Sequence, residues 1–147
     1  MLRTIWKGPL PPEQRNFAQL KEDLLLVITE VRRRAPKAQI VIATYPLILP
    51  PSGTCPKLGL TNEDAETMRT VGEHLAKITR GAALEGGAIL VDMQHLGADH
   101  HACSAEPWVN GSTETVGAEF HPTLAGALAT ARAISDALDH ATQVRTP

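Results

Sequence analysis

Two short apolar runs with a long amphipathic stretch between them constrain the fold of this chain most. Residues 39–45 and 88–92 consist mainly of β-branched and aliphatic side chains. Apolar runs of this length are typical of strands that are covered on both faces. The stretch between them is long enough for a helical crossover, so we expect a parallel pair of strands with a right-handed connection.

Three amphipathic helices are predicted around the two strands. The first spans residues 13–34 and ends before Pro36, because the residue before a proline is pushed out of the helical region. The second begins at a cap, Thr61 or Asn62, and two glycines end it. The third begins near residues 122–123. Apolar side chains recur at helical spacing in each helix: Phe17, Leu20, Leu24, Ile28 and Val31; Met68, Val71, Leu75 and Ile78; Leu124, Leu128, Ala131, Ile134 and Leu138.

The order helix, strand, helix, strand, loop, helix belongs to the α/β class. The 147 residues suit one domain, which we place at residues 13–141, between a proline-rich lead over residues 1–12 and a frayed tail over residues 142–147. Three helices on two apolar strands leave sheet edges open. The simplest explanation is that N-terminal strands are missing from this sequence. Self-association through the open edges is the alternative.

Charge and hydropathy exclude several classes of partner. Lys and Arg number 14 against 16 Asp and Glu, so nothing suggests binding to nucleic acid. The run Arg32-Arg33-Arg34 lies at the end of a predicted helix, where it complements the helix dipole. No apolar run approaches the roughly 18 residues of a membrane span, and residues 1–6 are too short for a secretory signal.

His121 lies at a junction between a long irregular segment and the last predicted helix, within Gly-Ala-Glu-Phe-His-Pro-Thr at residues 117–123. A histidine at such a junction can face a cleft while the helix behind it holds its backbone, which suits a general base. A ring that is only packed or solvated at a helix start is the structural alternative. No Gly-x-Ser-x-Gly motif accompanies the histidine.

The other titratable side chains near this segment do not predict a metal site. They are Asp92, His95, Asp99, His100 and His101. Adjacent histidines point in different directions, and no His-x-x-x-His pair occurs on a helix. We expect these side chains to hydrogen-bond the backbone, with Asp92 as a helix cap or loop acceptor. Neither a metal nor another cofactor is predicted.

Two aromatic residues are candidates for the border of a substrate cleft. Tyr45 ends the first strand, and ligands bind at the carboxyl ends of strands in open α/β sheets. Trp108 follows Pro107 in the long loop. It either lines a pocket beside His121 or anchors the loop, and anchoring is favoured. Asn110 and Gly111 then have the composition of a turn.

The two cysteines, Cys55 and Cys103, both lie in loops. From the residues alone, a disulfide and a pair of unpaired thiols are equally acceptable. A bond between them would close a loop of about 50 residues and stabilise the fold by roughly 3–4 kcal/mol.

Taken together, these segments resemble the C-terminal half of the SGNH hydrolases, the GDSL-type esterases and lipases, particularly their secreted actinobacterial branch. The resemblance covers about residues 13–140. It rests on Arg-Ala-Pro at 34–36, Thr-Tyr-Pro at 44–46, Gly-Thr-Cys at 53–55, Asp-His-His-Ala-Cys-Ser-Ala-Glu-Pro-Trp-Val-Asn-Gly at 99–111 and Phe-His-Pro at 120–122.

The resemblance implies a flavodoxin-like three-layer α/β/α fold with a parallel sheet, which hydrolyses carboxylic esters of small molecules or lipids. It implies that His121 is the general base that takes the proton of a serine hydroxyl. It further implies that Cys55 and Cys103 form a disulfide and that the protein is secreted.

The sequence departs from the family pattern in ways that bear on activity. The Gly-Asp-Ser nucleophile block and the Gly-x-Asn-Asp block of the family do not occur in it. Ala118 stands where the acid usually precedes the histidine, so either the Ala118 carbonyl orients the imidazole or Glu119 does so from one residue out of register. Thr123 replaces a frequent asparagine, and both residues cap helices.

We therefore expect a truncated, inactive ester-hydrolase fragment that has a base but no nucleophile. The alternative is a non-catalytic module for binding or oligomerisation on a degenerate α/β fold.

Overall fold

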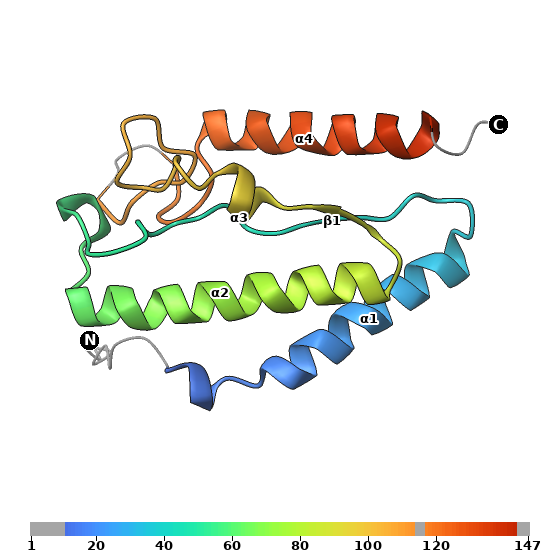
Figure 1. Cartoon of the computed structure of the whole chain (residues 1–147), viewed down its shortest axis with the longest axis horizontal. Helices are drawn as coiled ribbons and strands as arrows, with labels where there is room; N and C mark the ends of the chain where they lie inside the picture. The colour runs from blue at the N-terminus through green and yellow to red at the C-terminus, as the bar shows by residue number, and fades with distance from the viewer. Residues whose placement is uncertain (1–10, 114–116, 144–147) are drawn as a thin grey trace, which may run out of the picture.

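The computed structural model describes residues 11–113 and 117–143. Figure 1 shows the elements along the chain. In order, they are η1 (Pro12–Gln14), α1 (Phe17–Arg34), β1 (Val41–Ala43), η2 (Pro56–Leu58), α2 (Asn62–Glu85), β2 (Ile89–Val91), α3 (Met93–Leu96) and α4 (Leu124–Gln143).

The two strands lie between layers of helices. β1 and β2 are parallel, and their register pairs Val41 with Ile89 and Ala43 with Val91. α2 contacts both strands from one side, with α1 packed against it, and α4 contacts both strands from the other side (Figure 1). The predicted three-layer α/β/α arrangement with a parallel pair is therefore confirmed.

Side-chain caps fix where the helices begin. Asn16 accepts a hydrogen bond from the backbone N–H of Gln19 at 3.1 Å, so α1 starts at Phe17 and not at residue 13 as the apolar pattern predicted. Residues Pro12–Gln14, which precede α1, form the separate turn η1. Thr61 caps α2 by accepting from the N–H of Asp64 at 3.1 Å, as predicted.

The strands are shorter and less covered than their sequences predicted. Each has three residues, and Ala43 at the end of β1 is exposed, so the expectation of burial on both faces is wrong for β1. Among the described residues, neither strand pairs with a third one. A two-stranded pair leaves one edge of each strand without a hydrogen-bonded neighbour, which limits how much of the apolar run the sheet buries.

The loops at the carboxyl ends of the strands have an apolar cluster of their own. Leu49, Leu58 and Ala102 are buried there, and the ring of Phe120 packs against them. Both half-cystines are partly buried and pack against the same cluster. These loops gather at one end of the molecule, on the left of Figure 1. Phe120 and His121 belong to one of them.

No helix in the described ranges combines the length and the apolar content that crossing a bilayer requires.

Candidate active site

His121 belongs to a tight turn just before α4, at the carboxyl end of the strands. The turn runs from Ala118 to His121, and the backbone N–H of His121 donates to the Ala118 carbonyl at 3.2 Å. The side chain of His121 is exposed. The junction of loop and helix therefore presents the imidazole at the surface while the backbone behind it is held, as a general base requires.

The nearest polar partner of the imidazole is the backbone carbonyl of Glu119, whose oxygen lies 2.8 Å from Nδ1. A carbonyl only accepts hydrogen bonds, so Nδ1 carries the proton and Nε2 of the neutral ring keeps its lone pair. The sequence suggested that the Ala118 carbonyl orients the imidazole. In the structure the Ala118 carbonyl instead accepts from the backbone N–H of His121 and from the side chain of Asn110.

Asn110 lies in the long loop between α3 and α4, and it ties this loop to the turn that holds His121. Its backbone N–H donates to the His121 carbonyl at 2.9 Å, and its side-chain Nδ2 donates to the Ala118 carbonyl at 3.2 Å. An antiparallel bridge between Val109 and Pro122 lies beside these bonds. Asn110 is buried, and the sequence predicted only a turn there, because both of its acceptors lie across a long loop.

Tyr45 reaches the same turn from the end of β1. Its hydroxyl donates to the carbonyl of Phe120 at 2.8 Å. Burial raises the pKa of the Tyr45 phenol above its ordinary value of 10.0, so the hydroxyl keeps its proton at neutral pH. The structure thus connects this predicted cleft residue to the backbone immediately before His121.

Trp108 anchors the long loop in the way the sequence favoured. Its ring stacks on the ring of His100, with centroids 4.3 Å apart and planes 1° from parallel. The backbone N–H of Trp108 donates to the His100 carbonyl at 2.8 Å, and the Trp108 carbonyl accepts from the backbone N–H of Thr123 at 2.9 Å. Gly126 allows α4 to approach the Trp108 backbone, because a Cβ there would lie 2.1 Å from the Trp108 oxygen.

The Cys55–Cys103 disulfide that the family resemblance implied is present, with Cα atoms 5.9 Å apart. It joins the loop after β1 to the loop after α3. Through the apolar cluster, this bond supports the surface on which Phe120 packs. The disulfide therefore belongs to the scaffold behind His121.

Asp92 is a cap at the end of β2, as predicted, and it also joins three elements. Its Oδ1 accepts from the N–H of His95 at 3.3 Å and from the Thr44 hydroxyl at 2.9 Å. Its Oδ2 accepts from Nε of Arg80 on α2 at 2.7 Å. Burial opposes ionisation of Asp92, but the bonds from Arg80, Thr44 and His95 outweigh it and hold the pKa of this carboxyl below its ordinary value.

The serines do not supply a partner for the imidazole. Within the described residues, none of the four serine hydroxyls hydrogen-bonds to His121. Ser104 donates to the His101 carbonyl at 2.7 Å, and Ser112 donates to the Leu58 carbonyl at 2.7 Å. Ser52 and Ser135 are exposed, in a loop and on α4.

No group of three or more His, Cys, Asp or Glu side chains in the described part of the chain is arranged to hold a metal ion. The loop histidines have other contacts. Nδ1 of His100 lies 2.8 Å from the Glu106 carbonyl. Burial lowers the pKa of His101 below its ordinary value, although the charge of Asp99 opposes this shift.

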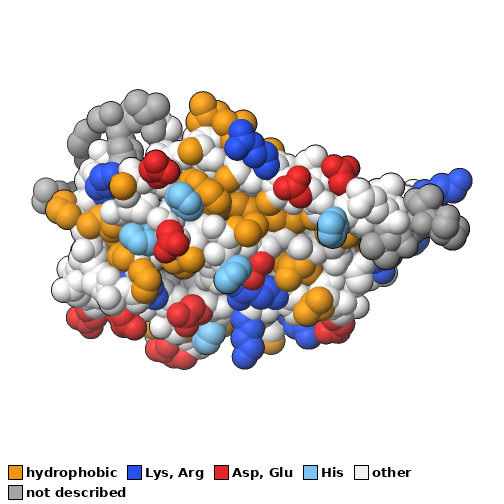
Figure 2. Space-filling model, turned by 45° about the horizontal axis from the view of Figure 1, so that its top comes forward, with side chains coloured by type: hydrophobic (Ala, Val, Ile, Leu, Met, Phe, Trp, Pro, Cys, Tyr) orange, Lys and Arg blue, Asp and Glu red, His pale blue; other side chains and the backbone are white. Residues whose placement is uncertain are grey.

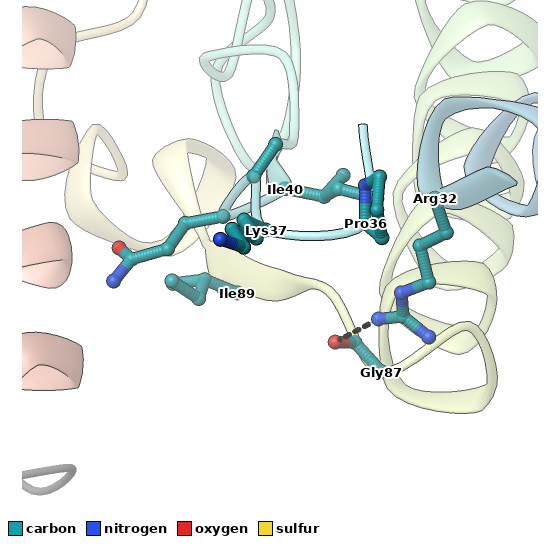
Figure 3. A pocket seen from close by; sticks show the side chains of 8 residues that line it. Arg32, Pro36, Lys37, Ile40, Gly87 and Ile89 are labelled. Atoms are coloured by element: carbon teal, nitrogen blue, oxygen red, sulfur yellow. Dashed lines mark hydrogen bonds between the residues drawn. The ribbon is translucent and has the colours of Figure 1, made fainter. Parts of the chain in front are cut away.

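A hollow of about 210 Å³ lies at the opposite end of the strands (Figure 3). Arg32, Pro36, Lys37, Gly87 and other residues line it, and Arg32 donates to the Gly87 carbonyl at 2.7 Å. Since ligands bind outside the carboxyl ends of strands in open α/β sheets, this hollow is at the wrong end for a catalytic site.

Comparison with known proteins decides the family. A sequence profile of the GDSL-like Lipase/Acylhydrolase family matches residues 5–129. The chain belongs to this family. A lipase from Streptomyces rimosus is 29% identical over 100 residues, which are 68% of this chain and 37% of that protein.

Solved structures of related proteins share the fold. An extracellular lipase from Streptomyces rimosus superposes with a TM-score of 0.68 at 27% identity, over 85% of this chain and 52% of that chain. A phospholipase A1 from Streptomyces albidoflavus superposes with a TM-score of 0.62 at 28% identity, over 78% of this chain and 47% of that chain. The chain thus spans about half the length of these solved relatives and about a third of the sequence relative.

Proposed function

We propose that this chain carries the general-base part of a carboxylic-ester hydrolase, with His121 as the base. The observation that carries the proposal is the contact of Nδ1 with the Glu119 carbonyl at 2.8 Å, on an exposed ring at the carboxyl end of the strands. Membership of the GDSL-like lipase and acylhydrolase family supports ester hydrolysis as the reaction.

The proposed chemistry is that of a serine hydrolase in which a backbone carbonyl takes the place of the acid. The lone pair on Nε2 takes the proton of an attacking hydroxyl while its oxygen bonds to the ester carbonyl carbon. The Glu119 carbonyl then stabilises the imidazolium through the Nδ1–H bond. When the tetrahedral intermediate collapses, the imidazolium returns the proton to the leaving alcohol.

The attacking hydroxyl belongs, in this proposal, to a polypeptide segment outside these 147 residues. The sequence has no Gly-Asp-Ser or Gly-x-Ser-x-Gly block. The serines of the chain hydrogen-bond other groups or lie at exposed positions. In this proposal the isolated chain is a truncated fragment. We therefore expect its ester turnover to be near background.

The substrates and the compartment are proposed from the relatives. Two of these are called lipases and one a phospholipase A1, so we propose esters of lipids or of small carboxylic acids as substrates. One relative is described as extracellular, and this chain has a disulfide, which persists in oxidising compartments. Secretion of the whole protein follows as part of the proposal.

The first test measures hydrolysis of a p-nitrophenyl ester by the isolated chain. Exposed imidazoles cleave such activated esters slowly without an enzyme, so His140→Ala on the exposed face of α4 is the matched control for His121→Ala. We expect equal, near-background rates for the chain and both variants. Turnover that only His121→Ala abolishes would contradict the inactivity of the isolated chain.

The second test uses a longer polypeptide. Its reading frame extends upstream of the chain to include any in-frame Gly-Asp-Ser segment. The longer polypeptide is expected to hydrolyse the ester, and His121→Ala is expected to lower its kcat at least roughly 100-fold, the range of general acid–base catalysis. An unchanged kcat in His121→Ala, with His140→Ala as the control, would refute the assignment of the base.

A binding or oligomerisation module is the second candidate, because large apolar side chains are exposed. Leu124 on α4 is 77% exposed, Leu84 on α2 is 72% exposed and Leu26 on α1 is 66% exposed. Figure 2, which turns the top of Figure 1 toward the viewer by 45°, shows hydrophobic side chains between charged ones on this side of the molecule. Sedimentation of the chain over a range of concentrations distinguishes the candidates, since a module of this kind forms a defined oligomer.

A further inference from the structure

Phe120 holds a backbone conformation that its side chain disfavours. Its φ is +58°, and it is the one non-glycine residue with positive φ in the described ranges. This region is occupied by glycine or asparagine in most turns, because Cβ crowds the backbone there. Strain of this kind persists only where the surrounding structure imposes it, and it concentrates at functional sites.

The positive φ of Phe120 accompanies a particular orientation of the peptide group between Glu119 and Phe120. In the turn from Ala118 to His121, the central peptide joins Glu119 to Phe120. A positive φ at the third residue of a turn accompanies the peptide orientation found in type II turns. In this orientation the Glu119 carbonyl lies 2.8 Å from Nδ1 of His121.

Two independent contacts hold Phe120 in this conformation. The Tyr45 hydroxyl donates to the Phe120 carbonyl at 2.8 Å, and Tyr45 lies two residues after the end of β1. On the other side, the Phe120 ring packs against the apolar cluster of Leu49, Leu58 and Ala102, on which both half-cystines also pack. One contact fixes the carbonyl and the other fixes the ring, so together they restrict rotation of the turn.

We propose that Tyr45 and Phe120 are positioning residues, which hold the Glu119 carbonyl against the imidazole and thereby fix His121 in the Nδ1–H tautomer. The proposal rests on the role of His121 as the base. In it Tyr45 is not a substrate-binding group. Its hydroxyl is already engaged by the backbone, and it acts on the reaction through the ring that it orients.

The variant Tyr45→Phe tests the proposal with little change in packing. It removes one hydroxyl from a side chain that is 48% exposed, and water can reach the carbonyl that is left. We therefore expect the melting temperature to stay nearly unchanged. A contact that is only structural would alter stability, whereas a positioning contact alters the state of the His121 ring.

The measurement is the long-range ¹H–¹⁵N NMR spectrum of the histidine rings in the full chain, at a pH where the imidazoles are neutral. In the wild type, Nδ1 of His121 is expected to show the signal of a protonated nitrogen. In Tyr45→Phe and in Phe120→Ala, both ring nitrogens are expected to move toward the averaged values of a freely exchanging imidazole. Should Phe120→Ala fail to fold, Tyr45→Phe decides alone.

Two controls accompany the spectra. His140 on α4 is the internal reference, and its signals should not change in either variant. Thr29→Val removes an exposed hydroxyl that donates to the Leu25 carbonyl at 2.8 Å on α1, and it should leave His121 unchanged. A His121 signal that stays the same in Tyr45→Phe, or a wild-type Nδ1 without the proton, overturns the proposal.

The proposed function and this inference fail separately. The ester assay of the longer polypeptide decides whether His121 is the base, whatever the tautomer is. The spectra decide whether Tyr45 and Phe120 fix the ring, whether or not the longer polypeptide cleaves esters.

Discussion

At the scale of single residues, Asp92 contributes most visibly to stability, because its carboxylate joins both strand ends and α2. Arg80 and Thr44 donate to it from α2 and from the residue after β1. Hydrogen bonds to charged groups contribute about 1.5–3 kcal/mol each when a partner is removed. We expect Asp92→Asn to lower the free energy of unfolding by roughly that amount in urea denaturation.

The control for this substitution is Asp139→Asn on the exposed face of α4, which should change stability by less than about 0.5 kcal/mol. The pH dependence gives a second check. The pKa of Asp92 is lowered from 3.8, so its contribution is present above that value and is lost as the pH falls through the lower folded pKa. If Asp92→Asn lost as much stability on acidification as the wild type does, this assignment would be contradicted.

His101 is expected to make the stability of the fold depend on pH in a higher range than Asp92 does. Burial lowers its pKa below 6.5 in the folded chain, so the unfolded chain binds the proton more readily. Stability is then full above 6.5 and falls as the pH drops from 6.5 toward the folded pKa. We expect urea midpoints measured between about pH 5 and 8 to show this fall, and His101→Gln to reduce it.

His140→Gln is the comparison, because this ring is exposed on α4 and its replacement should leave the pH profile unchanged. A wild-type midpoint that is flat across this range would show that His101 titrates normally.

The sequence pointed to some site residues and missed others for a definite reason. The position of His121 before the last helix and the cap at Asp92 were predictable, because each lies at a junction between elements, where a side chain next to a helix start has predictable partners. Arg80 and Asn110 were missed. Arg80 meets a carboxylate 12 residues away and Asn110 meets a carbonyl 8 residues away, and no local pattern encodes these contacts.

At the scale of the elements, the packing of α4 depends on Gly126. A Cβ there would lie 2.1 Å from the backbone oxygen of Trp108, and a backbone atom cannot move aside as a flexible side chain would. We expect Gly126→Ala to destabilise the fold by roughly 1–3 kcal/mol in urea denaturation, the usual cost of overpacking.

Gly72→Ala on α2 is the matched control. An added Cβ at Gly72 meets nothing within 4 Å, so only the helix propensity changes. This variant should be more stable by about 0.5–1 kcal/mol. Equal effects of the two substitutions, in either direction, would show that α4 does not pack on Trp108 as described.

The helices and strands were predictable in kind but not in extent. The helical stripes identified α1, α2 and α4, and the capping side chain Thr61 identified the start of α2. The strands are shorter than the apolar runs, because pairing needs a partner strand and only three residues on each side align. The short helix α3 was missed, since one turn leaves no periodic pattern.

At the scale of the whole molecule, the disulfide is the strongest single cross-link between the loops behind His121. It joins residues 48 apart in sequence. The variant Cys55→Ser/Cys103→Ser is expected to lose roughly 3–4 kcal/mol of stability, mainly because its unfolded chain regains the entropy of the open loop. A lower melting temperature of this variant is the measurement.

Dithiothreitol supplies the control, because it should lower the melting temperature of the wild type and leave that of the double variant unchanged. If reduction has no effect on the wild type, the bond does not contribute to the fold in solution.

The sequence by itself determined the α/β class, the parallel pair, the three amphipathic helices and the family, because periodicity, capping and short motifs are local properties of a chain. Only the tertiary structure decided which groups surround His121. The Glu119 carbonyl, the strained Phe120, the Tyr45 hydroxyl and the Asn110 side chain come together through turns and loop crossings. Such contacts depend on the direction of each peptide group in space, and residue order alone does not specify that direction.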